Sequence, residues 1–125
     1  DNVEKFLSEF ENYLSGIPTS FDKITLDISD KMPDFYRSSL MECMGIPYGE
    51  TLSYKQIAEK LGKPRSARAV GLAMARNPLP IIIPCHRVVR SDGGLGGYGG
   101  THSNISIKQL FLDIEKHSYQ SNKIR

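Results

Sequence analysis

The chain has no tryptophan, only two cysteines and no long hydrophobic run. Its longest apolar stretch, Pro78–Pro84, is far shorter than the roughly 20 residues of a membrane-spanning helix. Two cysteines cannot build a disulfide framework, and neither lies in a pattern typical of zinc sites. We therefore expect free thiols, no metal ion, no membrane segment and an intracellular location, in the cytoplasm and nucleoid or in a nucleus.

Charge is unevenly distributed along the 125 residues, although the formal net charge is only +2. Residues 1–50 carry four basic and ten acidic groups, a balance of −6, whereas residues 51–100 carry eight basic and two acidic groups, a balance of +6. In a composition typical of one globular domain, such a basic segment favours a polyanionic partner. Charge alone leaves accidental clustering on a solvated surface as the alternative.

Hydrophobic spacing predicts mainly helices with short strands. Apolar residues from Val3 to Leu14 recur at helical spacing and stop before Gly16, which predicts an N-terminal helix that serves in packing. Residues 21–28 alternate as a short strand would, but extended coil fits them equally well. A second helix is expected over about 35–45, and its candidates for the core are Phe35, Leu40, Met41 and Met44.

Residues 51–76 predict two helices joined by a tight turn. Ser53 is a candidate N-cap of the first helix, and Gly62 occupies the C-terminal position that favours left-handed backbone. The second helix should run from Ser66 to about Arg76. This order is the helix-turn-helix pattern of DNA-binding domains, although a plain helical hairpin has the same pattern.

The second of these helices lacks the hydrogen-bonding side chains that read bases in the major groove. Its small residues, which permit close approach to a backbone or a narrow groove, are Ala67, Ala69, Gly71 and Ala73. Glycine within a helix costs about 1 kcal/mol relative to alanine. Close approach to a partner or tight internal packing should therefore compensate at Gly71.

Cys85 is the candidate nucleophile. It follows Ile81–Ile83, predicted to be a short buried strand, and precedes three basic or titratable residues: His86, Arg87 and Arg90. A free thiol is only a few per cent thiolate near neutral pH, so nucleophilic use requires neighbours that lower its pKa. An inert buried cysteine is the alternative, and it is the interpretation we favour for Cys43.

His86 is the candidate base for Cys85. Adjacent residues of a strand point to opposite faces, so His86 would need a bend or a bridging water to reach the thiol. Glu115 is the candidate that fixes its tautomer, with a solvated carboxylate as the alternative. Glu115 should lie on a last helix, followed by a frayed tail from about 118, whose apolar positions are Ile107, Leu110, Phe111 and Ile114.

The glycine-rich loop 93–100 contains Gly-x-Gly-x-x-Gly from Gly94 to Gly99. It opens no helix directly and has no βαβ context, so we interpret it as a flexible cover near the site rather than a dinucleotide-binding loop. Tyr98 is expected to pack against whatever enters.

Residues 46–98, IPYGETLSYKQIAEKLGKPRSARAVGLAMARNPLPIIIPCHRVVRSDGGLGGY, closely resemble the catalytic domain of methylated-DNA–protein-cysteine methyltransferases, also called O6-alkylguanine-DNA alkyltransferases. Pro84–Val88 is the most specific part of the match, which extends weakly from about residue 3 to Glu115. The resemblance implies a winged-helix-like helix-turn-helix alkyltransferase domain over 31–118 and a tail over 119–125. Residues 1–30 would be at most a remnant of the family's N-terminal α/β domain, as in a truncated form or a fragment.

The resemblance also implies an activity: direct-reversal DNA repair by a monomer, without a cofactor. An alkyl group from O6-alkylguanine in double-stranded DNA, with O4-alkylthymine as a second candidate, would pass irreversibly to Cys85 after nucleotide flipping. His86 would act as a base through a bound water, and Glu115 would orient it. Asn77 would be the hinge between recognition helix and site, and Tyr54 would help turn the nucleotide out and protonate the leaving guanine.

Further site residues follow from the same resemblance. The helix 66–76 would enter the minor groove, with Arg68 filling the vacated stack. The implied DNA contacts are Tyr54, Ser66, Ala67, Arg68, Ala69, Gly71 and Arg87. The implied lining of the substrate pocket is Pro80, Val88, Tyr98 and Gly99. Compared with the family that it resembles, the loop between Tyr98 and Lys108 looks a few residues longer than usual.

Three other functions fit parts of the sequence. A lesion-binding protein of the alkyltransferase-like type would bind alkylated DNA without transfer, but such proteins lack the acceptor cysteine. A winged-helix regulator would read the major groove, which the alanine-rich second helix disfavours. A cysteine hydrolase would turn over repeatedly and need an oxyanion hole, for which the sequence offers no candidate.

Overall fold

A computed structural model describes residues 2–21, 32–96 and 105–124. The elements are helices α1 (Asn2–Leu14), α2 (Asp34–Met44), α3 (Tyr54–Lys60), α4 (Ala67–Ala75) and α5 (Ile105–Ile124), a 3-10 turn over Cys85–Arg87, and the two-residue strands β1 (Leu52–Ser53) and β2 (Val88–Val89). The predicted fold class, mainly α with short strands, is confirmed. Among the described helices, none is long and apolar enough to cross a membrane.

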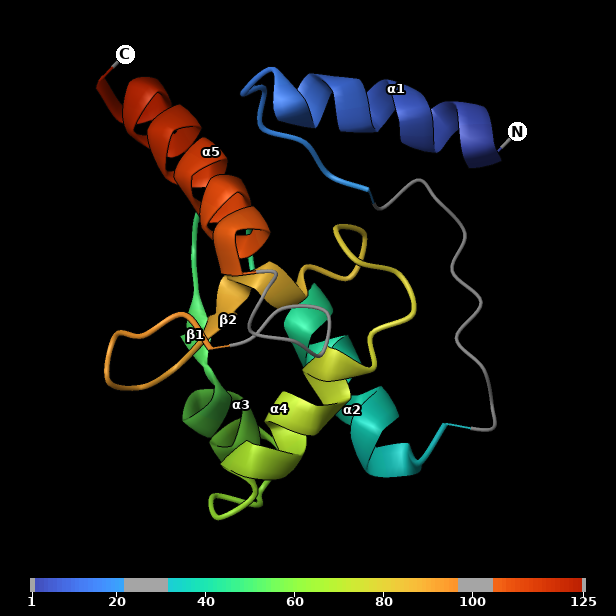
Figure 1. Ribbon diagram of the computed structural model, residues 1–125, viewed down its shortest axis with the longest axis vertical. Helices are drawn as coiled ribbons and strands as arrows, with labels where there is room; N and C mark the ends of the chain where they lie inside the picture. Colours follow the sequence, from blue (N-terminus) through green and yellow to red (C-terminus); the bar gives the residue numbers. More distant parts are fainter. Residues whose placement is uncertain (1, 22–31, 97–104, 125) are drawn as a thin grey trace.

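The helices form two groups around the small sheet. Figure 1 shows α2, α3 and α4 gathered at one end, α1 and α5 at the other, and the β1–β2 pair between them. The strands are parallel, with Leu52 opposite Val88. One continuous core joins the two groups, and its buried members include Leu40 of α2, Ile57 of α3, Val70 of α4 and Phe111 of α5.

The N-terminal helices follow their apolar spacing. The predicted helices over 3–14 and about 35–45 correspond to α1 and α2. In α2 Leu40 is fully buried, but Met41 is 55% exposed, so its assignment to the core was wrong. Phe21 is buried coil, and residues 22–28 of the expected strand lie outside the described residues.

The first helix of the expected helix-turn-helix is fixed by its N-terminal residues. The hydroxyl of Ser53 accepts a hydrogen bond from the Gln56 amide at 3.0 Å, and the Gln56 side chain accepts one from the Ser53 amide at 2.8 Å. This reciprocal cap satisfies two amides that the helix leaves unpaired. At the other end Gly62 has φ 73°, as predicted, and the chain turns into α4, which packs on α2 and α3.

The run Ile81–Ile83 is a turn, so the predicted strand was wrong. The side chain of Asn77 holds this turn. Its Nδ2 donates a hydrogen bond to the Ile83 carbonyl, and its Oδ1 accepts one from the Leu79 backbone amide, both at 2.8 Å. Prolines interrupt the segment and cannot donate to a strand ladder, which explains the difference. Ile81 adopts φ 77°, a left-handed conformation that β-branched residues rarely take.

The last helix is longer than expected. α5 continues to Ile124, through the residues predicted to fray from about 118. Two of its apolar positions do not face the core, because Ile107 is 43% and Leu110 51% exposed. Lys108 and Glu115 are buried there together with Phe111.

Candidate active site

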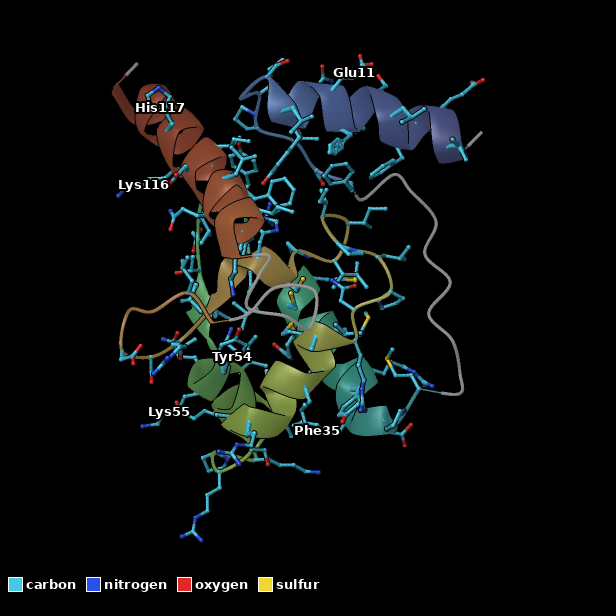
Figure 2. The ribbon with its side chains drawn as sticks, viewed as in Figure 1. Glu11, Phe35, Tyr54, Lys55, Lys116 and His117 are labelled. Atoms are coloured by element: carbon cyan, nitrogen blue, oxygen red, sulfur yellow. The ribbon has the colours of Figure 1, made fainter. Side chains whose placement is uncertain are left out.

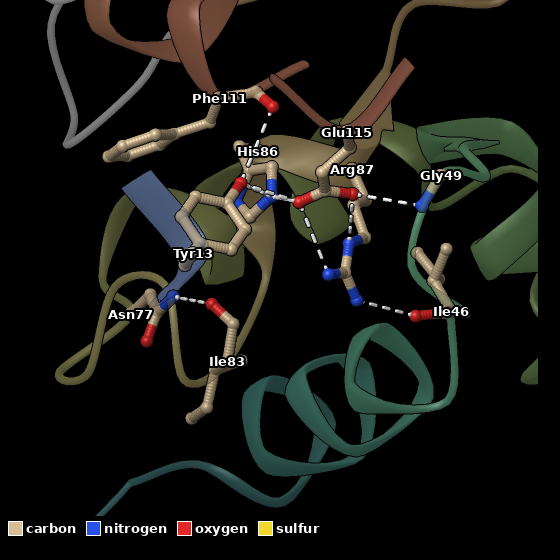
Figure 3. Close-up of polar contacts among 9 residues, drawn as sticks. All are labelled: Tyr13, Ile46, Gly49, Asn77, Ile83, His86, Arg87, Phe111 and Glu115. Carbon is tan, nitrogen blue, oxygen red and sulfur yellow. Dashed lines mark hydrogen bonds and ion pairs between the residues drawn. The ribbon is translucent and has the colours of Figure 1, made fainter. Parts of the chain in front are cut away.

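Glu115 is the centre of a buried polar network, shown in Figure 3. Its side chain is almost completely enclosed. One carboxylate oxygen, Oε2, accepts from Tyr13 Oη at 2.6 Å, from Arg87 Nη2 at 3.2 Å and from His86 Nε2. The other, Oε1, accepts from Arg87 Nε at 2.8 Å and from the Gly49 amide at 3.1 Å. The structure therefore brings Glu115 and His86 together, and the solvated alternative was wrong.

The charge of Glu115 is balanced by Arg87. Burial by itself would raise the pKa of Glu115, but hydrogen bonds from His86 and Arg87 outweigh it and lower the pKa to about 2. Arg87 is itself buried and also donates from Nη1 to the Ile46 carbonyl at 2.8 Å. Its guanidinium is thus committed to the interior, so the expected role of Arg87 as a DNA contact was wrong.

His86 is held in its neutral form. Burial lowers its pKa, and the neighbouring Glu115 opposes this only in part. An ionised carboxylate can only accept hydrogen bonds, so Nε2 carries the proton and Nδ1 carries a lone pair. Nδ1 is buried and has no hydrogen-bond partner among the described groups. A buried acceptor of this kind is normally satisfied by a water or a reacting group.

Cys85 begins the 3-10 turn that His86 continues, and its side chain is buried. Burial raises the pKa of the Cys85 thiol, while a hydrogen bond from Asn77 and the charge of Lys108 act in the opposite direction. The expectation of a pKa lowered by His86, Arg87 and Arg90 was wrong. Arg87 is paired with Glu115, and Arg90 pairs with Asp92 at the surface, 2.7 Å away.

Lys108 is a site residue that the sequence analysis missed. It is fully buried, and its Nζ donates to the Val88 carbonyl at 2.6 Å and to the Tyr54 hydroxyl at 3.3 Å. Burial lowers its pKa to about 8. The available signal was its spacing, because Lys108, Phe111 and Glu115 lie at i, i+3 and i+7 on one helix face.

Tyr54 lies between Lys108 and the glycine loop. Burial raises its pKa, and the side chain is only partly exposed at the start of α3. A Cβ at Gly96, whose φ is 74°, would collide with the Tyr54 hydroxyl. Glycine at 96 therefore lets the loop approach this phenol closely.

Most of the expected DNA contacts lie on α4 or at its N-cap. Arg68 is exposed, whereas Ala67, Ala69 and Gly71 are partly exposed, and Ser66 is the N-cap residue. A Cβ at Gly71 would lie 3.9 Å from the Tyr54 ring, an ordinary contact. Packing inside the chain therefore does not require this glycine.

The four residues expected to line the substrate pocket are only partly described. Pro80 is exposed. The side chain of Val88 is fully buried in the core, so it could meet a ligand only through its backbone. Tyr98 and Gly99 lie outside the described residues. Within the described part of the chain, no three histidine, cysteine, aspartate or glutamate side chains cluster in a way that could hold a metal ion.

A helix-turn-helix unit beside a buried cysteine, histidine and glutamate has the arrangement of an alkyltransferase-type DNA-binding domain. Residues 34–117 match the family described as 6-O-methylguanine DNA methyltransferase, DNA binding domain, and the chain belongs to this family.

Relatives of known name agree with this family assignment. The methylated-DNA–protein-cysteine methyltransferase of Methanosarcina barkeri is 48% identical over 88% of this chain. That of Mycobacterium leprae is 45% identical over 89%. The matched parts are 66% and 64% of those proteins, so the chain spans slightly less than two thirds of their length.

Solved structures share the fold. The Mycobacterium tuberculosis OGT in complex with DNA is 43% identical, with a TM-score of 0.81, and the match covers 90% of this chain and 66% of that one. The S. pombe protein Atl1, solved with damaged DNA containing O6-carboxymethylguanine, is 30% identical with a TM-score of 0.60, covering 68% of this chain and 78% of that one.

Proposed function

We propose that this chain repairs alkylated DNA by transferring the alkyl group of O6-alkylguanine irreversibly to Cys85. The observation that carries the proposal is a buried Cys85 thiol, contacted by Asn77, next in sequence to a buried His86 whose Nε2 is anchored by Glu115. The unpartnered Nδ1 of His86 is where a water would relay the thiol proton. No cofactor takes part in this scheme.

The proposed reaction conserves atoms and charge. The proton of the Cys85 thiol passes through the water to Nδ1 of His86, and the sulfur attacks the alkyl carbon. The bond from that carbon to guanine O6 breaks as the carbon–sulfur bond forms, and Tyr54 supplies a proton to the leaving guanine. The protonated His86 and the phenolate of Tyr54 that result balance in charge, and proton exchange with water returns both to their neutral forms. Water does not hydrolyse the thioether that forms at Cys85, so each chain acts once.

The raised pKa of Cys85 fits such a single-use nucleophile. A buried neutral thiol is protected from oxidation and from other electrophiles, because the thiolate is the reactive form. Ionisation then accompanies the arrival of substrate. His86 would therefore generate the thiolate by removing the thiol proton, without help from the nearby arginines.

The surface of α4 supports access to a base within a duplex. An O6-alkyl group is out of reach in stacked DNA, so the nucleotide must be flipped out at a cost of a few kcal/mol. The exposed Arg68 would fill the gap and offset part of that cost. Packing inside the chain does not require a glycine at position 71, but the absence of a side chain at Gly71 would allow α4 to approach the minor groove closely.

The finer architecture belongs to the same proposal. Residues 31–118 would act as a winged-helix-type DNA-binding and alkyl-acceptor unit. The two solved structures described above are complexes with DNA, one of them with DNA containing O6-carboxymethylguanine, and they support DNA as the partner of this chain.

Intact-protein mass spectrometry tests the function. The chain is incubated under reducing conditions with O6-benzylguanine or with duplex DNA containing O6-methylguanine. We expect one alkyl mass per chain, mapped to Cys85, absent in Cys85→Ser and retained in Cys43→Ser. Absence of an adduct in the parent chain, or an adduct in Cys85→Ser, would refute the proposal. Binding of alkylated DNA without an adduct would instead support a lesion-binding protein, and repeated turnover a hydrolase.

A further inference from the structure

We propose that Tyr13, on α1, is a positioning residue that tunes the basicity of His86 through Glu115. This inference rests on the proposed function, since it concerns the same base. It adds a residue that lies outside the matched DNA-binding domain, residues 34–117.

The contact is built into the interior. Tyr13 is fully buried, and its hydroxyl donates to Glu115 Oε2 at 2.6 Å. The same phenol oxygen lies 3.3 Å from His86 Nε2. Figure 3 shows the phenol approaching both side chains. Tyr13 and His86 therefore share one carboxylate oxygen.

The ring of Tyr13 is positioned by aromatic neighbours. It meets Tyr48 at 82° and Phe111 at 72°, with ring centroids 6.0 and 5.7 Å apart, and lies edge-on to the His86 ring at 6.3 Å. Edge-to-face packing of this kind is favourable and directional. Removing only the hydroxyl would leave the ring in place, so its polar role can be tested separately from its packing.

The effect of sharing Oε2 on the protonation of His86 has a predictable direction. A carboxylate oxygen that already accepts a short hydrogen bond from Tyr13 offers less negative charge to His86. Loss of that donor would strengthen the hold of Glu115 on a protonated imidazole and favour the charged form of His86. The hydroxyl of Tyr13 thus keeps His86 neutral, with Nδ1 free to accept a proton.

Other groups around the pair are held constant in the comparison. His86 faces Glu115 and Lys108 of α5 and Arg87 of its own turn. Glu115 also accepts from the Gly49 amide, and Tyr48 faces Tyr13. None of these groups is altered by Tyr13→Phe.

The test compares Tyr13→Phe with the parent chain in two measurements. The titration midpoint of His86 is followed by NMR of the ring nitrogens, with His102→Gln and His117→Gln variants for assignment. The rate of benzyl transfer from O6-benzylguanine is measured as a function of pH. We expect both the NMR midpoint and the acid limb of the rate to move up by roughly 0.5 to 1 pH unit, the size of one hydrogen bond. Below the midpoint, Tyr13→Phe should transfer the benzyl group about three- to tenfold more slowly than the parent chain. Above the midpoint, the rates of the two proteins should become equal.

The matched control is Tyr36→Phe, which removes a phenol that accepts from Arg76 at 3.0 Å instead of contacting Glu115. It should leave both curves unchanged. An unmoved His86 midpoint in a folded Tyr13→Phe chain would overturn the inference, and so would an equal loss of rate at every pH, which signals a structural role. If the parent chain accepts no benzyl group, the proposed function fails, but the NMR titration still tests the role of Tyr13.

Discussion

The Nζ of Lys108 donates a hydrogen bond to the carbonyl oxygen of Val88 at 2.6 Å, which ties the beginning of α5 to strand β2. The same ammonium reaches the Tyr54 hydroxyl and helps to stabilise a thiolate at Cys85. A charged group buried at this point joins three parts of the proposed site: the nucleophile, the candidate proton donor and the strand that precedes the glycine loop.

Replacing this lysine should make Cys85 less reactive. In Lys108→Met the favourable charge near Cys85 is lost, so the pKa of the thiol should rise further and its alkylation at a given pH should slow. Iodoacetamide labelling followed by peptide mapping separates Cys85 from Cys43. Lys116→Met removes an exposed lysine from the same helix and serves as the control; it is labelled in Figure 2. Equal labelling rates in the two variants would contradict the prediction.

Replacing Glu115 should destabilise the fold as well as the site. Glu115→Gln leaves the buried Arg87 without its counter-charge, and breaking such a pair typically costs about 3–5 kcal/mol. Urea unfolding at neutral pH measures this loss, with the exposed Glu59→Gln as control. A loss no greater than that of the control would show that the network adds little to stability.

Acid should weaken the parent chain in two stages. The folded pKa values of His86 and Glu115 both lie below their ordinary values of 6.5 and 4.5. The unfolded chain therefore binds protons first, so the contribution of each group is complete above its ordinary pKa. Stability should decline below about pH 6.5 through His86, and from about 4.5 to about 2 through Glu115. Urea unfolding across this range measures the decline, and the lower stage should be missing in Glu115→Gln.

Gly71→Ala should separate stability from DNA binding. Alanine fits beside the Tyr54 ring, so the variant should gain up to about 1 kcal/mol in helix stability. The added methyl group should obstruct the approach of α4 to DNA and weaken binding. Thermal unfolding and fluorescence anisotropy with a duplex measure the two effects. A stabilised variant with unchanged affinity would show that α4 does not approach DNA closely at this residue.

Arg68→Ala should impair transfer from duplex DNA but not from a free base. Transfer from O6-methylguanine in a duplex requires flipping, and loss of the inserted side chain should slow it about tenfold, equivalent to about 1.4 kcal/mol. Transfer from free O6-benzylguanine should be unchanged. Arg65→Ala, an exposed arginine in the preceding turn, controls for charge.

The DNA affinity of the parent chain should fall steeply as the salt concentration rises, because cationic contacts release counterions from phosphate. Fluorescence anisotropy with a duplex at several salt concentrations measures this dependence.

Local sequence determined much of the helical architecture. Ser53, Gln56 and Gly62 define α3 and its turn through contacts within a few residues, and the apolar spacing of α1 and α2 is regular. The candidate nucleophile and base were also predictable, because Cys85 and His86 stand in a family-specific run. Ile81–Ile83 was misread, since three isoleucines suggest a strand while the flanking prolines and Asn77 enforce a turn.

Tertiary structure alone decided which charges are buried and what they bind. Arg87 and Lys108 look in the sequence like ordinary basic residues, and Tyr13 looks like part of an apolar helix face. Their partners lie 28, 20 and 102 residues away, at Glu115, Val88 and Glu115. Burial makes these long-range bonds obligatory, because an unpaired polar group in the interior is costly. The sequence by itself thus determined the helices and the reactive pair, whereas the fold selected the groups that control its protonation.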